Sequence, residues 1–215
     1  MAPVVYYMSM SPAARATLLL VKALGIEVDL KEINLMAGEH MTPDFLTKNP
    51  FHTVPTLEDG DYTLWDSHAI NVYLIEKYAP DSDLYPKDPQ ARGTVLNRMF
   101  FNVGTAFPKL LAIGQSIFGG AKTVGKDKIA PVLAMYDQLE TLLQRDEFVA
   151  GENLTVADLS LVATISSLNV FVPIAENKYP KISRWLDRLK ALPYYFEGNQ
   201  KGLDTYQAMF KSKLA

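Results

Sequence analysis

The stretch from Asn49 to Tyr78 constrains the fold of this chain more than any other part of the sequence. It contains two short apolar runs, which end at Leu57 and Trp65 and flank a polar break around Asp59-Gly60. Two such runs on either side of an Asp-Gly pair are typical of a β-hairpin. A helical pattern follows the second run and ends at Tyr78. We therefore predict a strand, a tight turn, a strand and a helix in this order.

Pro55 is an unusual residue for the first of these runs. Proline cannot donate a hydrogen bond to a strand ladder, so it belongs at an edge or a special turn. The cis isomer of an X-Pro bond costs little free energy. A cis Pro55 would turn the backbone of Val54 outward and free its N–H and C=O for a peptide-like ligand. Ser67, preceded by Asp66, stands where the next helix should begin, and helix starts bind anions through unpaired N–H groups.

The residues before this stretch alternate between strand and helix patterns. We predict a strand over 4–8, a helix from Ser11-Pro12 to Gly25, a strand over 28–35 and a short helix after Thr42-Pro43. Serine or threonine before proline favours a helix start, and glycine favours a helix end. Strand-helix-strand alternation implies parallel pairing, and the hairpin adds an antiparallel pair. The result is an α/β domain with a mixed four-stranded sheet.

A proline-rich segment separates this region from a purely helical one. Residues 79–89 contain three prolines and several charges, which disfavour both helix and sheet. The expected helices cover roughly 89–119 with a bend near Gly104 and Pro108, then 126–146, 155–170, 180–192 and 203–213. Thr155 and Asp158 have the spacing of a capping box. We therefore predict a first domain at 1–78, a linker at 79–89 and an all-α domain at 90–215.

The composition excludes several classes of protein. The chain has 215 residues, a net charge of −3 and no cysteine. Its lysines and arginines do not cluster, which argues against nucleic-acid binding. Without cysteine the chain forms no disulfide, and the sulfur in any thiol chemistry must come from a ligand. No apolar run reaches the roughly 18 residues of a membrane span, and the N-terminus does not resemble a signal peptide, so we expect a cytoplasmic protein outside the membrane.

Several motifs together resemble a known family. The run Val54-Pro55-Thr56-Leu57, followed by Asp66-Ser67-His68-Ala69-Ile70, resembles the glutathione-binding half of cytosolic glutathione transferases. The segment Ser11-Pro12-Ala13-Ala14-Arg15 and the run from Asn49 to Pro55 resemble the insect delta and epsilon classes, epsilon more closely. The resemblance covers essentially the whole chain. It implies a thioredoxin-like first domain with a cis Pro55, a hydrophobic-substrate site in the helical domain, and a homodimer.

Ser11 is the residue that we expect to activate the thiol. Taken alone, a serine before proline is most often a helix N-cap, worth about 1 kcal/mol. The resemblance places Ser11 at the hydroxyl position of the serine-type enzymes. A thiol with a pKa of about 8.5 is only ~3% ionised at pH 7, and lowering that pKa by ~2 units requires ~2.7 kcal/mol. A hydrogen bond to a charged group contributes roughly 1.5–3 kcal/mol and a helix terminus roughly 0.3–1 kcal/mol, so one hydroxyl at a helix start suffices.

Three other residues compete with Ser11 for this role. Tyrosine-type transferases use a tyrosine at the end of the first strand, close to Tyr6 and Tyr7. The structural alternative is that one of these rings fills the core and the other lines the pocket. Ser9 lies nearer the end of the strand and could belong to the loop.

The resemblance also implies which residues bind the rest of glutathione. Ser67 would donate to the γ-glutamyl carboxylate, Asp66 would pair with the α-amine, and the Val54 backbone would bind the cysteinyl part. Asp66 and Ser67 would still serve as helix caps. The structural alternative for the histidines is a surface position, where an isolated histidine usually lies. The full expected set is His40, His52, Val54, Pro55, Asp66, Ser67 and His68. The histidine spacings match no metal-binding motif, so we expect glutathione as co-substrate, no metal and no nucleotide.

A second site should accept a hydrophobic molecule between the domains. Residues 99–119 contain no acidic residue and one base, Lys109, which favours flat or bulky apolar electrophiles. The positions implied by the resemblance are Leu35, Phe107, Leu110, Leu111, Gln115, Phe118, Tyr206 and Phe210. Since Phe and Leu at helical spacing are more often core residues, we expect about half of them to be packing residues.

These expectations define two functions. The first is a detoxifying glutathione transferase that conjugates the thiolate to small hydrophobic electrophiles, with peroxidase or dehydrochlorinase side activity. The alternative is a carrier of hydrophobic, steroid-like ligands in which transferase or peroxidase activity is incidental.

Overall fold

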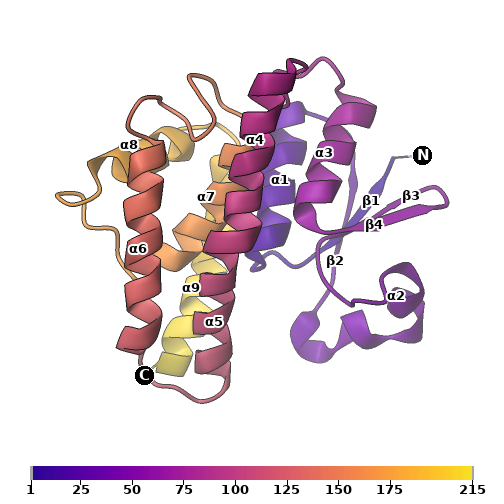
Figure 1. The fold of residues 1–215 in the computed structure, drawn as a ribbon. Helices are drawn as coiled ribbons and strands as arrows, with labels where there is room; N and C mark the ends of the chain where they lie inside the picture. Colours follow the sequence, from indigo (N-terminus) through magenta and orange to yellow (C-terminus); the bar gives the residue numbers. More distant parts are fainter. Residues whose placement is uncertain (1, 215) are drawn as a thin grey trace.

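The computed structural model describes residues 2–214 and consists of a small α/β part beside a larger helical part (Figure 1). The α/β part contains β1 (Val4–Tyr7), α1 (Pro12–Leu24), β2 (Asp29–Glu32), α2 (Pro43–Lys48), β3 (Thr56–Asp59), β4 (Tyr62–Trp65) and α3 (Ser67–Tyr78). Two single turns of 3₁₀-helix, η1 (Leu35–Ala37) and η2 (Glu39–Met41), connect β2 to α2. The predicted order of strands and helices is confirmed.

The sheet has the strand order β2-β1-β3-β4. β1 pairs with β2 in parallel and with β3 in antiparallel orientation, and β3 and β4 form the hairpin. The predicted mixed four-stranded sheet is therefore confirmed. The prediction of a strand over 28–35 is wrong in its second half. The Asn34 side chain accepts a hydrogen bond from the Ala37 N–H at 3.1 Å and so begins η1, which ends the strand.

The loop before β3 is held by one buried side chain. Asn49 Nδ2 donates to the Thr53 carbonyl at 3.2 Å and to Thr56 Oγ1 at 2.9 Å, and Asn49 Oδ1 accepts from the Phe51 N–H at 2.9 Å. The peptide bond between Val54 and Pro55 is cis, as predicted. The hydrogen bonds of Asn49 thus hold the loop that carries His52 and Val54.

The helical part begins after a segment of turns and bends at 79–88. It contains α4 (Pro89–Phe101), α5 (Phe107–Phe118), α6 (Lys126–Leu142), α7 (Val156–Asn169), α8 (Pro180–Lys190) and α9 (Lys201–Leu214). Two π-helical turns, η3 (Asn102–Ala106) and η4 (Phe196–Gln200), precede α5 and α9. The all-α second half is confirmed, and we keep the division at 1–78, 79–89 and 90–215 as a proposal.

The break expected near Gly104 and Pro108 takes the form of η3. Pro108 has no N–H to donate to the preceding turn, and a π-turn accommodates such a lost bond within a continuous helical path. The expected helix over 126–146 ends earlier, at Leu142, and the expected helix over 203–213 begins earlier, at Lys201.

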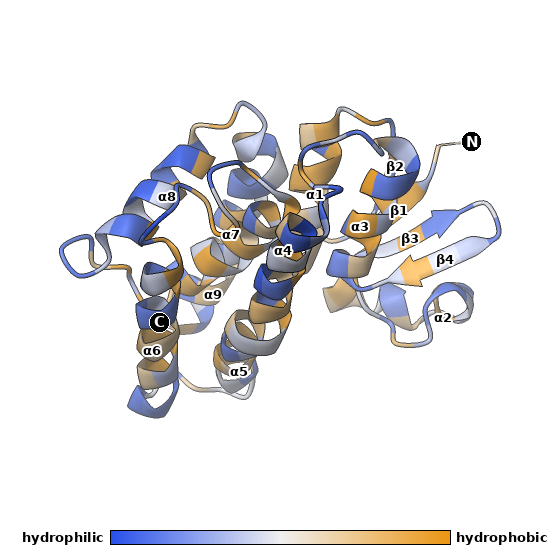
Figure 2. Ribbon diagram, turned by 45° about the horizontal axis from the view of Figure 1, so that its top comes forward, coloured by the Kyte–Doolittle hydropathy of each residue, from blue (hydrophilic) through white to orange (hydrophobic). Residues whose placement is uncertain are grey.

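Helix α7 forms the centre of the core. All its residues from Val156 to Leu168 are buried, and the predicted capping box of Thr155 and Asp158 is present. Asp158 also accepts a hydrogen bond from Trp185 Nε1 at 2.9 Å, which ties α7 to α8. Figure 2 shows hydrophobic segments along α1 and α7 and a largely hydrophilic α8. Among residues 2–214, the helices lack the combination of length and hydropathy that a membrane crossing requires.

Candidate active site

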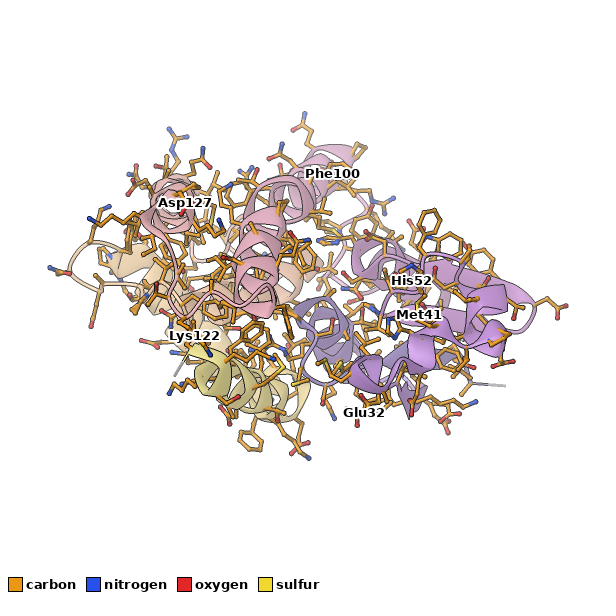
Figure 3. All side chains as sticks on the ribbon, turned by 90° about the horizontal axis from the view of Figure 1, so that it is seen from below. Glu32, Met41, His52, Phe100, Lys122 and Asp127 are labelled. Carbon is orange, nitrogen blue, oxygen red and sulfur yellow. The ribbon has the colours of Figure 1, made fainter. Side chains whose placement is uncertain are left out.

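A cavity of ≈ 380 Å³ lies between the start of α1, the loop before β3, the start of α3 and the helical part. Its walls include Ser11 and every residue predicted to bind glutathione, namely His40, His52, Val54, Pro55, Asp66, Ser67 and His68. Figure 3 shows His52 on the α/β part, on the same face as Met41. Residues from four separate segments of the chain thus meet in one place.

Ser11 combines a structural role with a free donor. Its Oγ accepts a hydrogen bond from the Ala14 N–H at 3.3 Å and caps α1, and its backbone N–H donates to the Met8 carbonyl at 2.8 Å. Accepting the cap bond uses an oxygen lone pair and leaves the hydroxyl proton free to donate. The helix cap and a hydrogen bond to a bound sulfur are therefore compatible.

The competing residues are engaged elsewhere. The Ser9 hydroxyl donates to Glu32 Oε1 at 2.7 Å, and the Tyr6 hydroxyl donates to Glu58 Oε2 at 3.3 Å. Tyr7 packs against the main hydrophobic core. Burial raises the pKa of both tyrosines, and the neighbouring carboxylates raise it further. Both rings lie outside the set of side chains that line this cavity, so the expectation that one of them lines it is wrong.

The start of α3 presents an acid and a hydroxyl to the cavity. Asp66 has a φ of 72°, and its Oδ1 accepts from the His68 N–H at 2.8 Å and the Ala69 N–H at 3.4 Å. A hydrogen bond from the His68 ring, 3.4 Å away, is the main cause of the lowered pKa of Asp66, although partial burial opposes it. Asp66 is therefore ionised at neutral pH and suited to an ammonium group. Ser67, which is buried, adds a hydroxyl beside the helix N-terminus.

His68 connects the two parts of the chain. Asn102, in η3, places its Nδ2 3.2 Å from His68 Nε2 and donates from the same nitrogen to the Ser160 carbonyl at 3.1 Å. In this arrangement His68 Nε2 accepts, so the ring proton is on Nδ1 and points to Asp66. Sequence reasoning missed Asn102, because its partners are far away in the sequence and only the expected break near Gly104 marked its surroundings.

The other end of the cavity carries two histidines. The ring centroids of His40 and His52 are 5.9 Å apart with an interplanar angle of 52°. His40 Nδ1 is buried and has no hydrogen-bond partner among the described residues. Buried polar nitrogens are rarely left unpaired, so this edge is chemically suited to a bound polar group such as a carboxylate.

A second, apolar cavity of ≈ 350 Å³ adjoins the first. All eight residues predicted for the hydrophobic site line it: Leu35, Phe107, Leu110, Leu111, Gln115, Phe118, Tyr206 and Phe210. Ser11, Leu35, Phe107 and Leu111 line both cavities, so the two spaces meet at Ser11.

Some of these residues are core residues at the same time. Leu110, Tyr206 and Phe210 are buried, whereas Leu111 and Phe118 are about half exposed. Sequence reasoning missed four methionines in the wall of the second cavity, Met8, Met10, Met36 and Met209. Methionine adapts to ligands of irregular shape, but one methionine in a sequence carries no such signal.

Across residues 2–214, the structure brings no three histidine or acidic side chains together in a way that could hold a metal ion.

Comparison with known proteins identifies the family. The model for the glutathione S-transferase N-terminal domain matches residues 2–76, and that for the C-terminal domain matches residues 104–193. Glutathione S-transferase 1 of Manduca sexta is 41% identical over 213 residues, which is 98% of each chain. An epsilon-class glutathione S-transferase from the housefly Musca domestica is 42% identical, with a TM-score of 0.96 and 98% of both chains covered.

One similar structure also contains a ligand. A glutathione transferase homologue from Drosophila mojavensis, solved with bound glutathione, is 43% identical, with a TM-score of 0.95, 99% of this chain covered and 97% of that chain. The matches extend over both halves of the molecule, including the segments that form the two cavities. The chain belongs to the glutathione S-transferase family.

Proposed function

We propose that this protein conjugates glutathione to small hydrophobic electrophiles and that Ser11 stabilises the reacting thiolate. The observation that carries the proposal is the position of Ser11, where the first cavity, which we call polar because three histidines, Asp66 and Ser67 line it, meets the apolar second cavity. A sulfur beside Ser11 would have the tripeptide on one side and an apolar molecule on the other. The relative from Drosophila mojavensis supports glutathione as the occupant of the polar cavity.

The polar cavity has groups for each part of the tripeptide. The Ser67 hydroxyl and the N–H groups at the start of α3 would bind the γ-glutamyl carboxylate, and Asp66 would pair with the α-amine. The backbone of Val54, beside the cis bond, would bind the cysteinyl part. His40 and His52 would bind the glycyl carboxylate, and Pro55 and His68 would shape the walls.

The reaction begins with ionisation of the thiol, whose proton leaves to water. Ser11 donates its hydroxyl proton in a hydrogen bond to the sulfur anion and remains intact. The thiolate then forms a carbon–sulfur bond while a halide leaves with the electron pair of the broken bond. When the electrophile reacts by addition, the sulfur bonds to one carbon of a double bond, and the electron pair of that double bond takes up a proton at the other end. The serine thus stabilises the nucleophile without becoming one.

The apolar cavity favours flat or bulky hydrophobic electrophiles. The same thiolate could reduce hydroperoxides or eliminate hydrogen chloride, so peroxidase and dehydrochlorinase reactions belong to this proposal as side activities.

The large apolar wall also favours the second candidate, a carrier of steroid-like ligands. Tight ligand binding without turnover, unaffected by Ser11→Ala, would support the carrier over the enzyme.

A cytoplasmic homodimer completes the proposal. Two large hydrophobic side chains, Phe51 and Phe100, are 62% and 66% exposed, and exposed apolar groups of this size often mark an interface. Light scattering should give twice the chain mass of 24.0 kDa, and a monomer at micromolar concentration would contradict this part of the proposal.

The function is tested by conjugation of a generic aromatic halide with glutathione, comparing the wild type with Ser11→Ala. Loss of a hydrogen bond worth roughly 1.5–3 kcal/mol should reduce turnover about 10- to 100-fold while glutathione affinity holds. Ser9→Ala is the matched control, because the Ser9 hydroxyl donates to Glu32 instead. A Ser11→Ala variant with full activity would show that Ser11 is only a helix cap.

A further inference from the structure

Arg15 is a buried cation on the same helix as Ser11, one turn further along α1. Its side chain is completely shielded from solvent, which arginine rarely is without a charged partner. The guanidinium donates to neutral groups, namely Asn199 Oδ1, Ser167 Oγ and, at 3.5 Å, the Ala163 carbonyl. In the described part of the chain, no carboxylate forms an ion pair with it.

The charge of Arg15 is retained at neutral pH. Burial lowers the pKa of the guanidinium to about 10, although two nearby tyrosines oppose this effect. Ser167 lies in the last turn of α7, where the helix dipole is negative and favours a cation. Dipoles stabilise the cation without cancelling its net charge, so its field extends to the neighbouring cavities, reduced by the effective dielectric constant of the protein.

The side chain of Arg15 lies between the Ser11 loop and the wall of the apolar cavity. The guanidinium carbon is 5.9 Å from the ring centroid of Tyr206, which lines that cavity. At Gly202 a methyl group would come within 2.0 Å of the Ser9 carbonyl oxygen and 2.8 Å of Arg15 Cδ. Only glycine allows α9 to approach this closely, and the approach places the cation beside the loop that leads to Ser11.

We propose that Arg15 is a positioning residue whose buried, unneutralised charge favours the thiolate form of the sulfur bound at Ser11. The inference rests on the proposed function, since it concerns the same thiol. Ser11 supplies the hydrogen bond to the sulfur, and Arg15 supplies a positive potential without touching it. A unit charge at ~10 Å in a medium of effective dielectric constant ~20 shifts a pKa by about one unit.

Other ionisable groups leave this potential in place. Tyr195 and Tyr206 face Arg15, and burial raises the pKa of both phenols, so they are neutral at neutral pH. The acidic side chains and the histidine of the packed elements have their own partners: Asp158 of α7 with Trp185, Glu197 of η4 with Lys201, Asp204 of α9 with Gln200, His68 of α3 with Asn102, Glu76 of α3 with Arg92, Asp29 of β2 with Lys31, and Glu32 of β2 with Ser9. Asp66, which lines the same cavity as Ser11, pairs with His68, and its charge is the same in every variant compared below.

The decisive variant is Asn199→Asp, which neutralises Arg15 without changing the shape of its partner. Asn199 Nδ2 donates to the hydroxyls of Tyr195 and Ser166. The Tyr195 hydroxyl can instead donate to an aspartate, and the Ser166 hydroxyl can do so by turning away from the Ala163 carbonyl, to which it donates at 3.3 Å. The measurement is the pH dependence of the ultraviolet absorbance of enzyme-bound glutathione thiolate. We expect the apparent pKa of the bound thiol to rise by about one unit, with the same shift in the pH profile of kcat/KM.

Two further variants separate charge from shape. Arg15→Lys keeps the charge, so the thiol pKa should stay close to that of the wild type even if the melting temperature falls. Thr17→Val alters another buried polar residue of α1 and should leave the thiol pKa unchanged. An Asn199→Asp enzyme with the thiol pKa of the wild type would overturn the proposal. A rise in Arg15→Lys as large as in Asn199→Asp would also overturn it, because geometry would then be responsible.

The same titration distinguishes this inference from the proposed function. A wild type that binds no glutathione would overturn both. A wild type with a low thiol pKa that rises in Ser11→Ala but not in Asn199→Asp would preserve the function and remove only the role of Arg15.

Discussion

Ser11, Asp66 and Ser67 stand at helix starts, where one side chain can serve the fold and the ligand together. An N-cap accepts a hydrogen bond from the helix and thereby uses an oxygen lone pair. Its remaining donor or its charge stays available to the cavity. A helix N-terminus also presents unpaired N–H groups, so an anionic ligand group binds at the same position as the capping side chain. A stability assay and a binding assay should therefore separate the two roles.

Asp66→Asn tests this separation, because asparagine caps a helix as well as aspartate does but carries no charge. We expect glutathione affinity to fall roughly 10-fold or more, since a charged partner of the α-amine is lost, while the melting temperature changes little. The matched control is Asp88→Asn, where Asp88 caps α4 through the Gln90 and Ala91 N–H groups away from the cavity. Equal affinity losses in both variants would contradict the assigned role of Asp66.

Sequence reasoning succeeded for residues whose role is decided locally. The N-caps Ser11 and Thr42 and the capping box at Thr155 each depend on a few neighbouring residues, and all are present. The cis bond at Pro55, which the resemblance implied, is also present. The resemblance to the glutathione transferase family is likewise confirmed by the comparisons. Arg15 is different, because its partner Asn199 is 184 positions away and no local pattern connects them.

At the scale of elements, lengths and distortions were the features that escaped prediction. The end of β2 depends on the side-chain bond of Asn34, which competes with the strand ladder. The π-turns η3 and η4 depend on how whole helices pack, so their residues carry no clear signal. η3 nevertheless places Asn102 beside His68, and η4 places Asn199 beside Arg15. The two π-turns therefore supply polar contacts between the two halves, in addition to the hydrophobic core that the halves share.

One carboxylate of the hairpin accepts three hydrogen bonds from α3, which makes the stability of this contact pH-dependent. Asp59 accepts hydrogen bonds from Tyr73, Lys77 and Tyr78 at 2.8, 2.7 and 2.6 Å. Burial acts to raise the pKa of Asp59, but these three donors outweigh it and lower the pKa overall. The stabilisation is therefore complete above the unfolded-state pKa of about 3.9 and is lost as the pH falls through the lower folded-state value.

Asp59→Asn should accordingly lower the free energy of unfolding by roughly 1.5–3 kcal/mol at pH 7, the worth of a hydrogen bond to a charged group. The difference from the wild type should shrink steadily below pH 4, where the wild-type carboxylate becomes protonated. Urea unfolding of the wild type and the variant, at pH 7 and at a pH below 4, measures this difference. Asp81→Asn is the control, because Asp81 is exposed and pairs only with Lys87 at the surface. A difference that persists undiminished at low pH would show that charge is not the cause.

At the scale of the whole molecule, the two halves share one hydrophobic core. A single cluster of buried side chains includes Val5 and Leu57 of the sheet, Leu20 of α1, and Leu161 and Trp185 of the helical part. Helix α1 is buried over all residues from Ala14 to Val21, so it supports both halves. A second, smaller cluster of Tyr6, Phe45 and Val54 lies within the α/β half alone, but the larger cluster spans both halves, and a shared core of this kind favours one cooperative transition.

We therefore expect the α/β and helical halves to unfold at the same urea concentration, although the sequence divides at a linker. Pulsed hydrogen exchange across a urea series should show β1 and α8 losing protection at one midpoint, at fixed protein concentration because association shifts apparent stability. Leu20→Ala leaves a cavity in the shared core and should lower both midpoints together, at a cost of about 2–5 kcal/mol. If β1 lost protection at a lower urea concentration than α8, the halves would be independent units. The thiol site, which lies between them, would then lose its geometry while the helical half stayed folded.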